Sequence, residues 1–207
     1  MKLDYIFFNI ETSDIDPTKG EIIDIAAIRT DNEGTIIVPY ADRIKPLKPV
    51  SEEAAKVNGY TESDWEGAIT FDRAYDSMVA TILEGRSNQF VVVAHYAMFA
   101  QAYLKSECDK IKQKVPFESR TWVDTFHLVW PVYADELIPN RSLKAVAEYY
   151  GVNTNGPHSA MSNVELLHAV YWRMMKRFHL VNNAESTVRK VGSSILDAAM
   201  GMMNGSK

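Results

Sequence analysis

The chain has 207 residues, of which 46% are hydrophobic and 24% are charged, so it is long enough for one domain with a sizeable core and short for two. Its formal charge of −5 argues against a protein that coats nucleic acid, because phosphate neutralisation needs clustered Lys and Arg. An enzyme that grips only the end of one strand is not excluded. No apolar run approaches a membrane span or a signal-peptide core, and the single cysteine, Cys108, cannot form an internal disulfide. We therefore expect a soluble, cytoplasmic protein with no membrane partner.

Three strands are expected at the start of the chain, over residues 5–10, 22–28 and 35–44. Each segment is apolar and β-branched or aromatic, and turn-forming residues separate the segments. Side chains two positions apart on a strand point to the same face, so Asn9 and Glu11 should project together. The end of the first strand is therefore the first candidate site.

Helical patterns alternate with short strands in the rest of the chain. Ser51 and Ser142 precede two of the helices as N-caps, while Gly59 and Gly151 follow their last turns. Three strands followed by strand–helix alternation predict an α/β fold with a mixed sheet of antiparallel and parallel strands, flanked by helices. The expected helices cover residues 52–57, 71–83, 96–108, 124–133, 143–150 and 159–178, and the expected strands cover residues 90–94 and 121–123.

Three separated motifs occur in order along the chain. Residues 9–12 (Asn-Ile-Glu-Thr) and 20–27 (Gly-Glu-Ile-Ile-Asp-Ile-Ala-Ala) form the first, residues 93–100 (Val-Ala-His-Tyr-Ala-Met-Phe-Ala) the second, and residues 158–163 (His-Ser-Ala-Met-Ser-Asn) the third. They resemble the motifs of the DEDDh 3′–5′ exonucleases, the superfamily of ribonuclease T and the proofreading subunit of DNA polymerase III. The resemblance implies a ribonuclease H-like domain over residues 1–180.

The resemblance also implies a metal site, from which this chain departs. The family holds two divalent ions with four carboxylates and uses a histidine as the general base. Here only Glu11 and the base His158 match, whereas Asn9, Ala100 and Asn163 stand at the other three ligand positions. Mg²⁺ is a hard ion that needs oxygen ligands and negative charge. Metal binding at Glu11 is therefore expected to be weak or absent.

Other carboxylates are not expected to replace the missing ligands. Asp14 and Asp16 lie in the turn after the first strand and could approach the site. Asp124 follows a strand at a position that is not usually a metal ligand in the family. Glu165 lies two residues beyond Asn163 on a helix and should point elsewhere. We expect no rescue of the ion cage from this set.

A substrate groove beside Glu11 follows from the same resemblance. Its candidate wall residues are Thr12, His95, Tyr96 and Phe99. His95 also has a structural interpretation, because it stands at the end of a buried strand.

The tryptophans divide into two groups. Trp65 stands before a Glu-Gly loop and is expected to be exposed as a possible contact residue. Trp122, Trp130 and Trp172 are expected in the core.

Residues 181–207 lie beyond the resemblance and form an extension that is expected to be helical. Apolar residues recur on one helical face between Thr187 and Met203. This helix would either pack back on its own domain or dock to a partner protein or a second copy of the chain.

Three functions remain open from the sequence. The first is a catalytically inactive exonuclease-like protein, without a cofactor, that binds a single-stranded nucleic-acid 3′ end or a protein partner. The second is an active 3′–5′ exonuclease on single-stranded DNA or RNA, using Mg²⁺ or Mn²⁺, or an engineered inactive version of one. The third is a protein-binding regulator or inhibitor with no nucleic-acid role.

Overall fold

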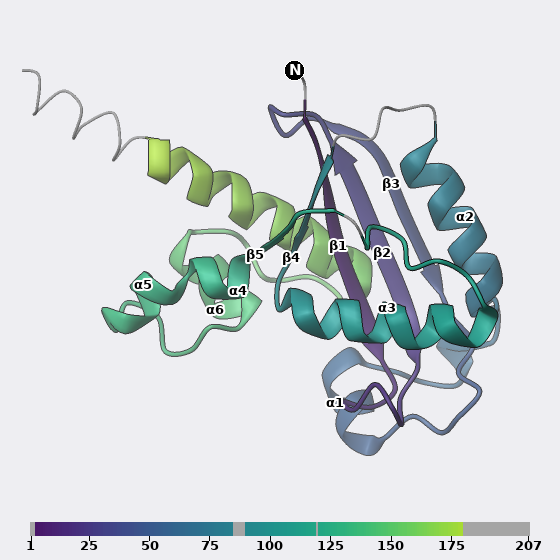
Figure 1. Ribbon diagram of the computed structural model, residues 1–207. Coiled ribbons are helices and arrows are strands. Elements are labelled where there is room, and N and C mark those ends of the chain that lie inside the picture. The colour runs from purple at the N-terminus through teal and green to yellow at the C-terminus, as the bar shows by residue number, and fades with distance from the viewer. Residues whose placement is uncertain (1–2, 85–89, 119, 180–207) are drawn as a thin grey trace, which may run out of the picture. The chain divides into compact units, whose positions relative to one another are not determined.

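A mixed five-stranded sheet flanked by helices organises the computed structural model (Figure 1). The chain divides into two compact units, residues 1–170 and 171–207. The helix expected within residues 181–207 lies outside the described residues. None of the helices in the described part of the chain is long and apolar enough to cross a membrane. The described residues are 3–84, 90–118 and 120–179.

The sheet has the strand order β3-β2-β1-β4-β5. The first three strands pair antiparallel, while β4 runs parallel to β1 and β5 runs parallel to β4. This is the mixed sheet that the sequence predicts, and it brings the ends of β1 and β4 together. The strands are β1 (Asp4–Thr12), β2 (Ile22–Thr30), β3 (Ile36–Arg43), β4 (Phe90–Ala94) and β5 (Trp122–Asp124).

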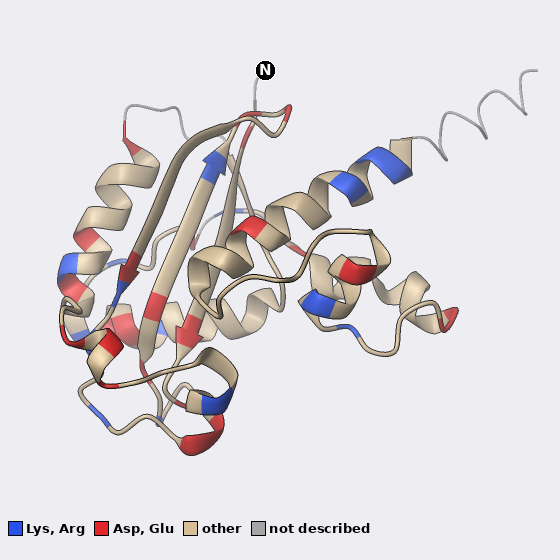
Figure 2. Cartoon of the chain, turned by 180° about the vertical axis from the view of Figure 1, so that it is seen from behind, with Lys and Arg blue, Asp and Glu red and all other residues tan. Residues whose placement is uncertain are grey.

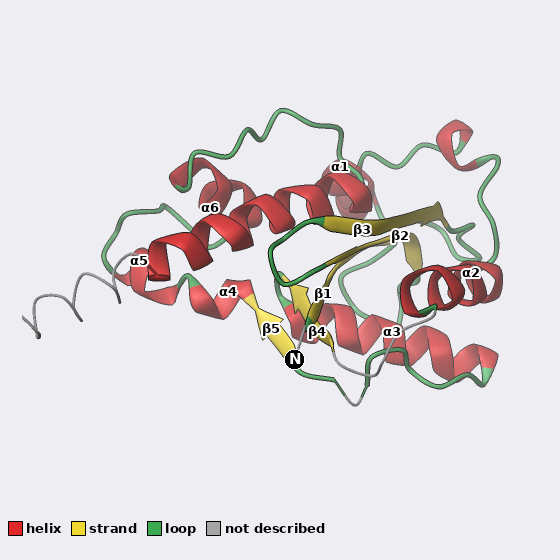
Figure 3. Ribbon diagram, turned by 90° about the horizontal axis from the view of Figure 1, so that it is seen from above, coloured by secondary structure: helices red, strands yellow, loops and turns green. Residues whose placement is uncertain are grey.

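Two long helices, α2 and α3, pack on the same face of the sheet (Figure 3). The bounds predicted for α2 are those observed, and Ser51 and Ser142 cap α1 and α6 as expected, each accepting a bond from a backbone N–H. The helices are α1 (Glu52–Asn58), the short 3₁₀ helix η1 (Ser63–Trp65), α2 (Phe71–Leu83), α3 (Ala97–Ile111), α4 (Thr125–Leu128), α5 (Trp130–Ala134), α6 (Leu143–Tyr149) and a last helix over residues 160–179.

The two faces of β1 have different neighbours. Ile6, Phe8 and Ile10 point into the main hydrophobic cluster, which includes buried side chains of α2 and α3. The intervening side chains face the last helix. There the rings of Phe7 and His168 pack edge to face, with their centroids 4.9 Å apart. Since alternate residues share a face, the polar side chains at the end of β1 also face this helix.

The helix expected over residues 124–133 is in fact two helices. It breaks at Val129, and Pro131 lies at the start of α5. Proline has no N–H to donate to the carbonyl four residues earlier, and its ring is best tolerated in a first helical turn. The helical pattern of the sequence spans this break, which explains why the expectation was wrong.

The expected exposure of two tryptophans is reversed. Trp65 is only 6% exposed, its Nε1 donates to the carbonyl of Ile23 at 2.7 Å, and Arg43 lies over its ring. The 3₁₀ helix turns this side chain inward, where its N–H has a partner. Trp130 is 53% exposed because the short helix α5 lies at the surface.

Candidate functional site

The carboxylate of Glu11 is held by two amide side chains. Asn163, from the first turn of the last helix, donates from Nδ2 to Oε1 of Glu11 at 2.8 Å. Asn9, two residues earlier on β1, donates from Nδ2 to the same oxygen at 3.3 Å. The structure thus brings together three of the residues singled out in the sequence. In this cluster the two amides act as donors to the carboxylate.

Burial raises the pKa of Glu11 from 4.5 to about 7. The hydrogen bond from Asn163 opposes this rise, the negative charge of Asp24 adds to it, and the hydrogen bond from Asn9 opposes it again. Loss of hydration disfavours the ionised carboxylate more than the two neutral donors stabilise it. Near neutral pH Glu11 therefore carries only part of a negative charge.

Asp24 is a second carboxylate at the site, and the sequence interpretation missed it. It pairs with Glu11 across β1 and β2, so the two side chains share one face of the sheet. Figure 2 shows acidic positions, in red, on strands of this sheet. Its Oδ2 accepts a hydrogen bond from the backbone N–H of Ala160 at 2.9 Å and so caps the last helix. The signal was present in the sequence, because antiparallel pairing of the first two strands puts Asp24 opposite Glu11.

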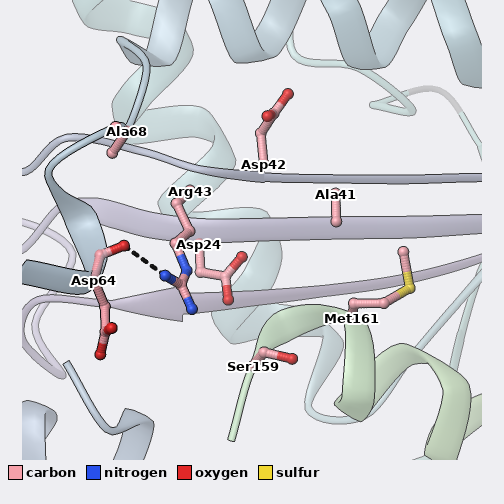
Figure 4. A pocket seen from close by; sticks show the side chains of 9 residues that line it. Asp24, Ala41, Asp42, Arg43, Asp64, Ala68, Ser159 and Met161 are labelled. Carbon is pink, nitrogen blue, oxygen red and sulfur yellow. Dashed lines mark hydrogen bonds between the residues drawn. The ribbon is translucent and has the colours of Figure 1, made fainter. Parts of the chain in front are cut away.

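Arg43 provides a positive charge beside Asp24. The two residues are paired across β2 and β3, and both line a cavity of about 340 Å³ together with Ser159 and Met161 (Figure 4). Burial raises the pKa of Asp24, and the charge of Arg43 acts against this rise. Figure 4 shows Asp42 pointing away from this cavity. Asp24 is therefore engaged by the helix start and by Arg43.

Ala100 and His158 do not take part in the hydrogen bonds of this cluster. Ala100 is 5% exposed and belongs to the main hydrophobic cluster, and its methyl group has no donor atom for a metal ion. His158 is exposed in the loop before the last helix and makes no hydrogen bond with any described residue. It lines a cavity of about 520 Å³ that Asn163 and Glu165 also line. Of the two residues that match the family site, Glu11 is therefore held by hydrogen bonds, whereas the side chain of His158 is exposed beside a cavity.

Glu11 also lines a groove of about 600 Å³. Thr12, Tyr96 and Phe99, three of the four residues predicted for it, line this groove together with residues of α1. We call it the Glu11 groove. Asp14 also lines it, whereas Asp16 is bonded within its own turn to Thr18. Aromatic side chains from the start of α3 thus form one wall beside the carboxylate.

His95, the fourth predicted residue, does not line the groove. Its Nε2 lies 2.8 Å from the carbonyl oxygen of Arg141, to which it donates, and its Nδ1 lies 2.9 Å from Oγ1 of Thr125. Burial lowers the pKa of His95, which favours the neutral ring that these two contacts suit. The geometry supports its structural interpretation.

Tyr96 has a backbone conformation that is rare for its residue type. Its φ of 66° and ψ of 58° are left-handed, a region that suits glycine and asparagine. Asp124 holds this turn, because its Oδ1 accepts from the N–H of Tyr96 at 2.9 Å and its Oδ2 from that of Ala97 at 3.0 Å. The ring of Tyr96, which is 51% exposed, stacks on Phe99. The strained residue therefore presents an aromatic face to the Glu11 groove.

The donor set does not fit a pair of divalent ions. Two such ions need several anionic oxygens, whereas this site offers Glu11 and an already engaged Asp24. Asn9 and Asn163 turn their N–H groups toward Glu11, and Ala100 contributes nothing. Within the described residues, no group of three or more His, Cys, Asp or Glu side chains is arranged to hold a metal ion.

Comparison with known proteins identifies relatives for most of the chain. The model of the RNase T exonuclease family matches residues 6–171. The PolC-type DNA polymerase III of Caldanaerobacter subterraneus subsp. tengcongensis is 26% identical over 84% of this chain. The DNA polymerase III subunit epsilon of Aquifex aeolicus is 22% identical over 83% of this chain and 80% of its own length.

A solved structure shares the fold. Escherichia coli exonuclease I in complex with a dT13 oligonucleotide superposes with a TM-score of 0.72 at 17% identity, over 87% of this chain and 43% of that one. The chain spans only 12% of the PolC-type relative from Caldanaerobacter. The family match, the relatives and the ribonuclease H-like sheet agree with the three motifs. The chain belongs to the RNase T family of exonucleases, within the DEDDh 3′–5′ exonuclease superfamily.

Proposed function

We propose that this chain is a catalytically silent member of the exonuclease family, which binds a ligand through the Glu11 groove without cutting it. The observation that carries the proposal is the pair of hydrogen bonds from Asn163 and Asn9 to the Glu11 carboxylate. In a two-ion site this carboxylate would face cations. Here neutral amide donors take that place. The site therefore has fewer anionic oxygens to attract the ions, and Oε1 of Glu11 already accepts two hydrogen bonds.

The energetic consequence falls on the attacking water. Without bound divalent ions, the pKa of a water molecule stays far above neutrality rather than falling to about 7, and the charge on the leaving oxygen is not stabilised by a metal ion. A histidine acting alone as a general base contributes roughly 10²- to 10⁴-fold. His158 is therefore unable to compensate for the loss of several kcal/mol of transition-state stabilisation.

The retained groove supports a binding function. The sheet, the capped helices and the aromatic wall beside Glu11 are intact although three ligand positions have changed. The E. coli exonuclease I structure contains an oligonucleotide, so a single-stranded 3′ end is one candidate occupant of the groove. Several relatives are DNA polymerase III polypeptides, so a protein partner is another.

A nuclease assay tests the absence of catalysis. End-labelled single-stranded DNA and RNA would be incubated with the purified chain in Mg²⁺ or in Mn²⁺ and resolved on a gel. We expect no shortening beyond that given by the Glu11→Gln variant prepared in the same way. The matched variant separates catalysis at this site from a contaminating nuclease, because only the former needs Glu11.

Metal-dependent shortening by the unaltered chain that disappears in Glu11→Gln would contradict the proposal. The combined variant Asn9→Asp, Ala100→Asp, Asn163→Asp serves as the gain-of-function arm. Its three added carboxylates restore the charge that two divalent ions require. We expect cleavage in this variant alone.

A further inference from the structure

The walls of the Glu11 groove are formed largely by apolar side chains. Ile15 is 83% exposed, Val57 is 69% exposed and Tyr96 is 51% exposed, and all three line the groove. Large apolar side chains gathered at the mouth of a cavity mark an interaction site on a soluble protein. The remaining apolar walls are Ala54 and Phe99.

The charged residues of the groove have one sign. Glu11, Asp14 and Glu53 line it, and no Lys, Arg or His does so among the described residues. Glu53 is exposed and makes no hydrogen bond or ion pair with the described residues. Lys56 is on the same helix as Glu53 but is paired with Glu52 at 3.8 Å, outside the groove lining. A ligand therefore meets apolar walls with an acidic rim.

We propose that the Glu11 groove binds a peptide segment of a partner protein, which inserts an apolar side chain and places a Lys or Arg beside Glu53 and Asp14. This inference rests on the proposed function and names the partner class for the same site. The stacked rings of Tyr96 and Phe99, which lie 11° from parallel, offer a flat wall to the inserted side chain. The carboxylates of Glu53 and Asp14 attract the Lys or Arg of the peptide and so orient it in the groove.

Charge decides between a peptide and a nucleic acid. A phosphate in the groove would face carboxylates with no cation among the described lining residues, and the missing ion cage removes the usual source of compensation. The formal charge of −5 on the whole chain adds to this repulsion. A cationic peptide gains from both the local and the overall charge.

Two matched probes test the inference on the chain of 207 residues. N-acetylated peptide amides with the sequences Lys-Trp-Lys and Glu-Trp-Glu share their apolar anchor and differ in charge. Binding would be followed by NMR chemical-shift mapping at low ionic strength, where exposed charges are least screened. We expect shifts centred on Ile15, Val57 and Tyr96, and about tenfold tighter binding of the cationic probe.

Two charge-reversal variants locate the preference. Glu53→Lys should remove most of the difference between the probes, because it changes the sign of one rim residue. Glu148→Lys, which alters an exposed glutamate on α6, changes the net charge equally and should leave the preference in place. Val57→Ser should weaken both probes alike, since it removes apolar wall without changing charge.

Three results would overturn the inference. The first is equal affinity for both probes or shifts that lie elsewhere. The second is an oligothymidylate that occupies the groove more tightly than the cationic peptide. The third is a set of groove shifts that appear on dilution of the chain alone, which would make a second copy the occupant. Cleavage that depends on Glu11 would instead overturn the proposed function, so the two failures are distinguishable.

Discussion

At the scale of single residues, the cluster around Glu11 depends on the difference between an amide and a carboxylate. An amide and a carboxylate have nearly the same shape, but the amide presents N–H donors where the carboxylate presents only acceptors. Asn163 and Asn9 use these donors to bind Glu11. An asparagine at these positions fills about the same space as an aspartate but donates hydrogen bonds to Glu11. The carboxyl group of Glu11 is buried and has a raised pKa.

The raised pKa of Glu11 gives stability a specific pH dependence. Between 4.5 and about 7 the folded chain retains a proton that the unfolded chain has released. The contribution of Glu11 to the free energy of unfolding is therefore complete below this window and falls as the pH rises through it, by about 3 kcal/mol. Urea unfolding across the window should show this decline.

Glu11→Gln is the control for that measurement. Glutamine does not titrate, so the variant should lose this part of the slope and keep the rest. An unchanged slope in the variant would show that other groups cause the pH dependence.

Tyr96 provides a test of backbone strain at the mouth of the groove. Its left-handed conformation should make Tyr96→Gly more stable than Tyr96→Ala by about 1 kcal/mol, because only glycine adopts this region without a steric cost. Both variants lose the same ring, so their difference isolates the backbone term. Thermal or urea unfolding of the pair would measure it. Equal stability would mean that the turn relaxes.

The residue scale also marks a limit of sequence interpretation. The family motifs grouped Glu11 and His158 with Asn9, Ala100 and Asn163. Hydrogen bonds join three of these residues, Asn9, Glu11 and Asn163. Asp24 was missed since its role depends on register between two strands. Trp65 was misplaced because a 3₁₀ turn directed it inward to the carbonyl of Ile23.

At the scale of secondary-structure elements, Asp124 at the end of β5 connects two helices. Its carboxylate accepts from the N–H groups of Tyr96 and Ala97 at the start of α3 and from that of Phe126 in α4. One side chain therefore satisfies N–H groups that the first helical turns leave without partners. This capping role explains why Asp124 lies near the site without joining the hydrogen-bonded cluster around Glu11.

The capping role of Asp124 predicts a large loss on truncation. Asp124→Ala should lower the free energy of unfolding by about 3 kcal/mol, since two helix starts lose their acceptor together. Ser142→Ala, which removes a single bond to Ala145 at the start of α6, should cost about 1 kcal/mol. Denaturant unfolding of both variants gives the comparison. Similar losses would contradict the shared-cap role.

Helix and strand bounds were predictable where local signals were strong. The apolar spacing predicts the bounds of α2, the serine caps predict where α1 and α6 begin, and the glycine after α1 predicts where that helix ends. The break between α4 and α5 was missed because the apolar spacing continues past it, and only Pro131 marks the change. Local sequence signals thus predict the bounds of most helices and strands. A proline can break a helix even where the apolar spacing continues past it.

At the scale of the whole molecule, the fold and the site have diverged in different ways. The sheet order, the helices on its face and the family match are those of an exonuclease. The changed positions lie on the polar face of β1, in α3 and at the start of the last helix. The fold was predictable because its apolar pattern is intact, whereas the groove walls depend on tertiary contacts between β1, α1 and α3.

A calorimetric titration with Mn²⁺ tests most directly the proposal that this site does not hold a pair of divalent ions. The unaltered chain and the variant Asn9→Asp, Ala100→Asp, Asn163→Asp would be titrated at the same pH, with circular dichroism to verify folding. With Glu11 bound by amides and Asp24 engaged at a helix start, we expect no saturable heat from the unaltered chain and saturable binding in a folded variant. Two saturable Mn²⁺ sites in the unaltered chain, abolished by Glu11→Gln, would contradict this proposal.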